Sequence, residues 1–354
     1  MTKQNKSRYT SLMNRIALIL LVCCLLIYFS GRVLNFTRSL IIMAEGYNIV
    51  ADVIFLLLGC VSDFLVIYFV PVRIFKYFQQ NSFREKNMPV ERKIISDDII
   101  LPVFLLGLSL TFIGYVFNST AVNALTDYVG FGEDYLFLSG MKYGYQIVIY
   151  MISIAVLPAV FEELVFRKTL CDALAPYGPK TAILVTSILF SLMHTNFSRI
   201  FHTFIMGFFC AWLYIGTKNI KWAMLLHFFN NLFSGVEVVI AYRVSSDAAY
   251  AFQRLRFFAF VVIAIVCFIK LNNKRQEQRL LEVREAREMN AYEAYLEKKR
   301  KYANHIEMLP DENGEEVISL SKQDKIKGFF SPLMIVFVVA TLIQMYYYLT
   351  FLLV

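Results

Sequence analysis

Long apolar stretches alternate along this chain with shorter segments that hold most of its charged residues. Because a helix that crosses a bilayer needs about 20 predominantly apolar residues, this pattern predicts an all-α, polytopic transmembrane bundle of about nine spans, with about eight as the alternative. The predicted spans are Ile16–Val33, Ile49–Val72, Ile99–Phe117, Tyr145–Leu170, Thr181–His194, Phe201–Gly216, Trp222–Tyr242, Phe257–Ile269 and Phe329–Val354.

Lysine and arginine gather in the segments that this alternation places on one side of the membrane. Cytoplasmic loops are enriched in these residues, so the basic segment Arg73–Asp98 is predicted to be cytoplasmic. The short break Cys171–Lys180, which follows Arg167 and Lys168, is placed on the same side. The same rule places the N-terminus in the cytoplasm. No small-x-small cleavage site follows the first apolar run, Ile16–Phe29, which favours an uncleaved span over a signal peptide.

A charged block, Lys270–Lys327, separates the last two predicted spans and contains 13 Lys/Arg and 12 Asp/Glu. Its first part, Leu271–Met308, has no glycine or proline and is predicted to be a cytoplasmic helix that extends the preceding span. The turn-forming run Leu309–Gly314 then ends this helix. Two interpretations stay open, a solvated charged helix or a helix that docks a partner at residues 271–308.

Composition agrees with a membrane protein and narrows the classes of function. Of the 354 residues, 58% are hydrophobic, and the mean hydropathy is +0.56, whereas a soluble domain is roughly 45–50% apolar. The net charge of +8 argues weakly for nucleic-acid binding, because the basic residues flank apolar spans and act there as topology signals. The six cysteines are scattered without a CxxC pair, so the sequence predicts neither a disulfide framework nor a thiolate zinc site.

Two adjacent glutamates and an arginine stand near the end of the fourth predicted span, and ionisable groups at membrane depth mark function by default. Glu163 and Arg167 are four residues apart, so on a helix their side chains meet and the arginine would keep Glu163 ionised. Glu162 projects about 100° away round the helix and is available as a general base. The alternative is that these residues are ordinary flanking charges at the cytoplasmic edge of the membrane.

Two histidines follow, each in an apolar run of its own. Phe190 lies one helical turn before His194 and could pack against its ring. His227 and Asn231 share a helical face and could donate two hydrogen bonds to a developing oxyanion. The alternatives are a packing role for His194 and an interhelical polar clamp for His227 and Asn231. His194 is expected to lie deeper in the membrane than the glutamates, so that it reaches them only if its helix starts low or tilts.

Three short motifs occur in order along the chain, Glu162-Glu163-x-x-x-Arg167, Phe190-x-x-x-His194 and His227-x-x-x-Asn231. Together they resemble the CAAX protease and bacteriocin-processing (Abi) family of intramembrane endopeptidases, which is related to the type II CAAX prenyl proteases. The resemblance covers about Tyr145–Ile240.

This resemblance implies a site in which Glu162 and His194 activate a water molecule, while His227 and Asn231 form the oxyanion hole. It also implies that the second glutamate and the arginine of the first motif hold the site together. The reaction would be peptide-bond hydrolysis without a covalent intermediate and without a required cofactor. A zinc ion held by His194, His227 and a glutamate is the mechanistic alternative, since such a set can form a catalytic zinc site.

We therefore divide the chain into N-terminal spans and loops (residues 1–144), a catalytic membrane core (145–242) and C-terminal spans (243–354) with the charged segment 270–327. The expected partners are the lipid bilayer and a peptide substrate, such as a prenylated tail, a bacteriocin or pheromone precursor or a membrane-protein fragment. The expected location is a bacterial cytoplasmic membrane, with the endoplasmic reticulum as the eukaryotic alternative. Two functions from other classes stay open. One is a transporter that relays ions through Asp52, Asp63 and Glu162, and the other is a scaffold without catalysis.

Overall fold

The computed structural model describes residues 3–45, 49–80, 95–129, 144–196, 199–288 and 321–351, and every element within these ranges is helical. Short π-helical and 3-10 segments carry η labels. In chain order the elements are α1 (Lys3–Glu45), α2 (Ile49–Asp63), η1 (Phe64–Phe69), α3 (Val70–Gln80), α4 (Asp97–Val129), α5 (Gly144–Met151), η3 (Ile152–Val156), α6 (Leu157–Glu163), η4 (Leu164–Cys171), α7 (Asp172–Leu174), η5 (Ala175–Tyr177), α8 (Pro179–Met193), α9 (Ile200–Thr217), α10 (Ile220–Arg243), α11 (Ser246–Glu288), α13 (Lys322–Phe329) and α14 (Pro332–Phe351).

The predicted all-α, polytopic fold is confirmed. Within the described ranges, six helices are long and apolar enough to cross a membrane, and the pair α13 and α14, bent by 59°, raises the number to seven. Two predicted spans, Ile49–Val72 and Thr181–His194, are not in this group. The second corresponds to α8, whose 15 residues span roughly 22 Å at 1.5 Å per residue, less than the ~30 Å of a bilayer core. This is an integral membrane protein in which α8 is too short to cross the bilayer core by itself.

The eighth predicted span, Phe257–Ile269, is only the middle of a much longer helix. In the structure α11 runs for 43 residues without interruption, so the predicted continuation from Leu271 is confirmed as far as Glu288. The remainder of that predicted helix and the turn after it lie outside the described residues.

The last predicted span, Phe329–Val354, starts three residues later than expected. The chain bends at Phe330 and Ser331, and α14 begins at Pro332. Proline is favoured at the first position of a helix because its missing N–H needs no partner there. Asn14 of α1 accepts a hydrogen bond from the next backbone N–H, that of Leu333, at 3.2 Å, which attaches the start of α14 to the N-terminal helix.

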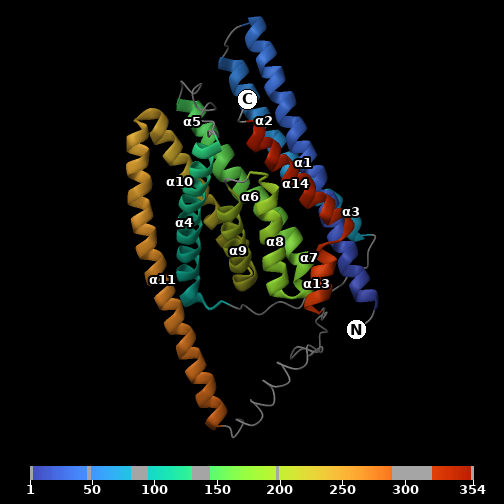
Figure 1. The fold of residues 1–354 in the computed structure, drawn as a ribbon, viewed down its shortest axis with the longest axis vertical. Coiled ribbons are helices and arrows are strands. Elements are labelled where there is room, and N and C mark those ends of the chain that lie inside the picture. Colours follow the sequence, from blue (N-terminus) through green and yellow to red (C-terminus); the bar gives the residue numbers. More distant parts are fainter. Residues whose placement is uncertain are drawn as a thin grey trace.

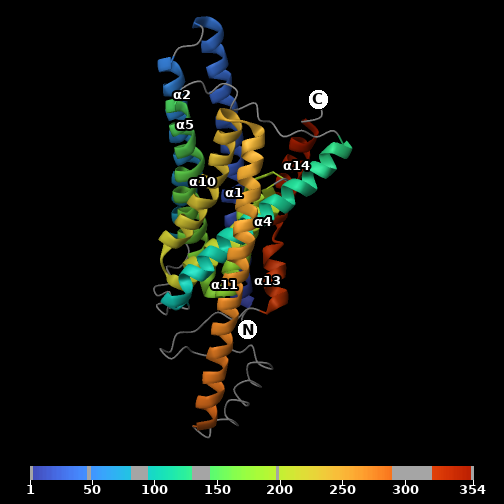
Figure 2. The same cartoon turned by 90° about the vertical axis from the view of Figure 1, so that its left-hand side faces the viewer.

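The helices form a bundle with α11 along one edge and α1 with α14 along the other, as Figure 1 shows. The helices α8 and α9 lie between these edges in the lower half of that view. Figure 2 shows α4 crossing the bundle obliquely and α11 extending well beyond the other helices as a stalk. The site described below is therefore enclosed by helices rather than placed on a loop.

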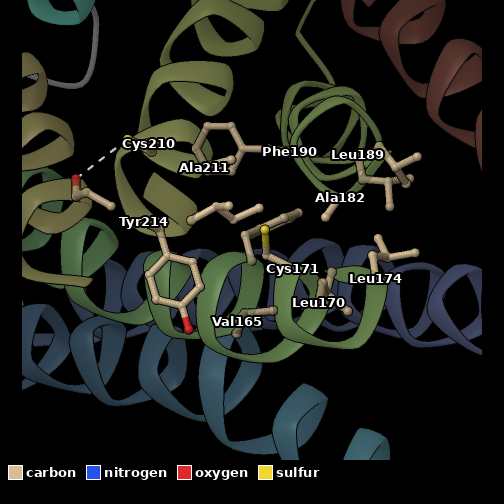
Figure 3. Close-up of a cluster of buried hydrophobic side chains, with 14 of the residues drawn as sticks. Val165, Leu170, Cys171, Leu174, Ala182, Leu189, Phe190, Cys210, Ala211 and Tyr214 are labelled. Atoms are coloured by element: carbon tan, nitrogen blue, oxygen red, sulfur yellow. Dashed lines mark hydrogen bonds between the residues drawn. The ribbon is translucent and has the colours of Figure 1, made fainter. Parts of the chain in front are cut away.

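Small residues allow α8 and α9 to approach closely at the centre. A Cβ atom on Gly207 of α9 would lie 3.2 Å from the Ser187 Cα of α8, so the two backbones are almost in contact there. Small residues at helix interfaces permit such packing in membranes. Figure 3 shows the hydrophobic cluster that these two helices build with η4, including Leu170, Phe190 and Cys210. This cluster fixes the helix that carries Arg167 against the helices beside it.

Candidate active site

The ion pair predicted from spacing is present and fully buried. Arg167 Nε lies 2.7 Å from Glu163 Oε2, and Arg167 Nη2 donates to Glu163 Oε1 at 3.2 Å. Both side chains are 0% exposed. The guanidinium also lies over the rings of Phe190, at 5.0 Å, and Phe166, at 6.0 Å. A buried charge is tolerated only with a good partner, and this pair has both an opposite charge and aromatic faces.

His227 of α10 is the second partner of Glu163. Its Nδ1 atom donates to Glu163 Oε1 at 3.0 Å, and its ring is buried. This bond turns Nε2 of His227 toward Glu162, whose Oε2 lies 4.0 Å away. The Glu162 side chain is 18% exposed, in contrast to its neighbour. The adjacent carboxylates therefore occupy different surroundings, since Glu163 is fully buried in the network and Glu162 is partly exposed, with its Oε2 atom buried.

His194 ends α8 and reaches the same region through Phe190. Its Nδ1 donates to the Phe190 carbonyl at 2.8 Å, and the two rings are 4.8 Å apart. The other side of Phe190 meets His227 edge to face, with ring centroids 5.7 Å apart. The two histidines thus flank one phenylalanine, although His194 enters the bundle from a short helix. Thr195 follows with a left-handed φ of 46°, which ends α8 immediately after this histidine.

Asn231 takes part in a clamp between α10 and the helix of the first motif. Its amide Nδ2 donates to the Ile154 carbonyl at 2.9 Å, and its Oδ1 accepts from Asn230 at 3.0 Å. Ile154 lies four residues before Pro158, and proline has no N–H with which to complete the usual helical bond to that carbonyl. The backbone around it is π-helical, a form that occurs often at functional sites. The alternative of an interhelical polar clamp therefore describes this contact of Asn231. Its partner Ile154 was not predicted, although Pro158 was an available signal.

The hydrogen bond from Asn231 to the Ile154 carbonyl is expected to stabilise the fold. Asn231→Leu should lower the free energy of unfolding by about 1–3 kcal/mol, because it leaves a carbonyl without its donor inside the bilayer. Pro158→Ala supplies a backbone N–H four residues after Ile154, so the same asparagine change should cost less in that background. Denaturant titration in micelles measures both losses as a double-mutant cycle. Equal losses in the two backgrounds would contradict the account of Pro158.

The hydrogen bonds at Nδ1 of His194 and His227 determine which chemical roles their Nε2 atoms can take. Because each Nδ1 carries a proton, the neutral form of each ring presents a lone pair at Nε2. In that form Nε2 can accept a hydrogen bond or a proton, or bind a metal ion, and it donates only when the ring is protonated. Within the described ranges, no three His, Cys, Asp or Glu side chains are grouped so as to hold a metal ion.

A further cation near His194 was not anticipated. Arg199 stands at the N-cap of α9, across the turn from His194, and is exposed. Its positive charge interacts electrostatically with the side chains of His194, His202 and Tyr150. Nothing in the sequence was a reason to select Arg199, because the distance between Arg199 and His194 depends on how the chain turns between them. The side chains of Asp52 and Asp63, of the transporter alternative, lie outside the described part of the structure.

Comparison with known proteins agrees with the motifs. Residues 144–233 match the model of the family described as type II CAAX prenyl endopeptidase Rce1-like. The UPF0177 protein YxdF of Lactococcus lactis subsp. lactis (strain IL1403) is 35% identical over 75 residues, 21% of this chain and 41% of the relative, so the chain spans less than half of that protein. No solved structure matches significantly. The matched region contains every candidate residue, so residues 144–233 are similar to the Rce1-like type II CAAX prenyl endopeptidases.

Proposed function

We propose that this chain is an intramembrane endopeptidase in which Glu162 activates a water molecule for attack on a peptide bond. The observation that best supports it is the different placement of the two adjacent carboxylates. Glu163 is bound by Arg167 and His227, whereas Glu162 faces Nε2 of His227 across 4.0 Å. This distance is too long for a direct hydrogen bond, so the two side chains can act on different groups, Glu162 on the water molecule and His227 on the oxyanion.

The proposed reaction proceeds by general base and then general acid catalysis. Glu162 takes a proton from the water while the water oxygen bonds to the scissile carbonyl carbon. His194 Nε2 accepts a hydrogen bond from the second hydrogen of the water. The carbonyl electrons move onto oxygen. When the tetrahedral intermediate collapses, the C–N bond breaks and protonated Glu162 returns its proton to the leaving amine. A positioned acid or base contributes about 10²–10⁴-fold to such a step.

The oxyanion is assigned to His227 and Asn231. With its ring protonated, His227 donates its Nε2–H to the oxyanion, while its Nδ1–H stays bonded to Glu163. Asn231 keeps one amide hydrogen beyond the bond to the Ile154 carbonyl, since its NH₂ group carries two. Donors held in place before the reaction stabilise developing charge most effectively.

We further propose that no metal ion is required, with Zn²⁺ as the alternative. The Nε2 lone pairs of His194 and His227 are chemically suited to zinc, so a metal titration is the deciding measurement. Full activity after exhaustive chelation is the expected result. Activity that chelation removes and zinc restores would overturn the metal-free proposal.

The proposed substrate class is supported by the family description and by the resemblance of the three motifs. It is the carboxyl-terminal tail of a prenylated protein, a bacteriocin or pheromone precursor, or a membrane-protein fragment, reached within the bilayer. A bacterial cytoplasmic membrane with the N-terminus inside is the proposed location. Segment 271–308 is a proposed partner site, and nucleic acid is not expected to bind.

The membrane proteome of the host tests the function directly. Cells with the wild-type protein are compared with cells that carry Glu162→Gln at equal abundance. A peptide bond cut only in wild-type cells would support the proposal and name the substrate. Identical sets of termini, with both proteins folded, would contradict it.

A further inference from the structure

The helix α13 lies far outside the matched residues 144–233, yet it packs against the turn that joins two parts of the proposed active site. Its Gly328 leaves room for the ring of Tyr9 in α1, and Tyr9 in turn lies 4.8 Å from the ring of Tyr177. Asp324 pairs with Lys6 at 2.8 Å, which adds a second attachment to α1. At this end of the bundle, α13 and α1 therefore contact each other, and α1 contacts Tyr177 of the matched region.

Lys325 makes the direct contact with the turn. Its Nζ donates to the Tyr177 carbonyl at 2.7 Å and to Thr181 Oγ1 at 3.0 Å. The same atom lies 3.7 Å from the point that a Cβ on Gly178 would occupy. Gly178 has a φ of +104°, a conformation that other residues rarely adopt, so the backbone reverses under this ammonium group.

The turn at Tyr177 and Gly178 sets the angle between the two helical segments that hold the proposed catalytic residues. Before it, α6 and η4 hold Glu162 and Arg167, and after it α8 ends at His194. With 15 residues, α8 is a lever of roughly 22 Å at 1.5 Å per residue, so a tilt of about 3° at the turn moves His194 by about 1 Å. A misplacement of about 1 Å can cost roughly 10²-fold in rate.

We propose that Lys325 is a positioning residue, which holds α8 at the angle that places His194 and Phe190 beside His227. This inference rests on the proposed function. It assigns to the C-terminal segment a part in catalysis, although that segment contributes no group to the site. The ammonium can fill this role because it bonds both sides of the turn, at Tyr177 and at Thr181.

The test compares Lys325→Met, which keeps most of the stem and removes the donor, with Lys322→Met. Lys322 is an exposed residue of the same helix, so its change matches the first in charge and size. Lys325→Met is expected to lower kcat by about tenfold to 10²-fold with little change in KM. The reason is that the change displaces His194, which acts in the chemical step, and leaves substrate binding unaffected. Lys322→Met should leave both constants unchanged, and Lys325→Arg should restore most of kcat. A full kcat in folded Lys325→Met would overturn the proposal, as would an equal loss with Lys322→Met.

Hydrogen exchange separates this inference from the proposed function. In the Glu162→Gln background, where no catalysis is expected, Lys325→Met should speed amide exchange in residues 175–184, and Lys322→Met should not. Faster exchange without any loss of kcat in the otherwise wild-type enzyme would overturn the positioning role and leave the proposed function intact. If wild-type protein cuts no peptide, the proposed function fails, and the positioning role, which depends on it, fails as well. The exchange result would then report only the contact of Lys325 with the turn.

Discussion

Glu162→Gln is expected to lower kcat for peptide-bond hydrolysis by about 10²–10⁴-fold in the purified, bilayer-embedded protein, since an amide cannot accept the proton of the attacking water. The side chain keeps its shape, so KM should change little. Initial rates over a range of substrate concentrations, on a peptide found in the proteome comparison, measure both constants.

The structure provides a reason to expect a folded variant. Glu162 is 18% exposed and lies 4.0 Å from His227, whereas Glu163 carries the short buried bonds. The buried network is therefore left in place, and the unfolding midpoint should match that of the wild type. Glu277→Gln on the stalk is a suitable charge-matched control, because Glu277 is exposed and pairs there with Lys274.

A wild-type kcat in Glu162→Gln would contradict the assignment of the base. Another outcome would favour a different class of function. If the protein conducts ions, if Glu162→Gln abolishes that flux, and if wild-type membranes show no cleavage, the transporter alternative replaces the protease. Flux through protein-containing liposomes, measured beside proteolysis, distinguishes the two.

Contacts within one helix were the part of the site that the sequence could predict. Glu163 with Arg167 and Phe190 with His194 are each four residues apart, and helical geometry alone brings such pairs together. The helical class followed from the apolar stretches for the same reason, because length and composition are local properties. The depth of His194 was less certain, since it depends on the length and tilt of α8.

Contacts between helices could not be predicted in the same way. The bond from His227 to Glu163 joins residues 64 positions apart, and the bond from Asn231 to Ile154 joins residues 77 apart. Spacing says nothing about which faces of two helices meet. Apolar composition likewise does not show that α8 is shorter than a spanning helix, because its length depends on where the chain turns.

The buried network should be as important for folding as for chemistry. Arg167→Met is expected to lower the free energy of unfolding by about 3–5 kcal/mol, since it leaves the Glu163 carboxylate buried without its strongest partner. Such a loss is a large share of the roughly 5–15 kcal/mol that stabilises a typical protein. Activity should fall with it, because His227 takes its orientation from that carboxylate. Reversible denaturation in micelles measures the first effect, and proteolysis at a temperature where the variant is folded measures the second.

The next residue along the same helix is the control. Lys168 has a side chain that is 64% exposed, and its ammonium lies 3.4 Å from Asp172. Exposed pairs contribute about 0–1 kcal/mol, so Lys168→Met should have almost no effect on stability. A double variant, Glu163→Gln with Arg167→Met, removes both charges and should recover part of the loss, since an unpaired buried charge costs more than a neutral amide. If Arg167→Met were no more harmful than Lys168→Met, the ion pair would not stabilise the site, and the orientation of His227 would need another cause.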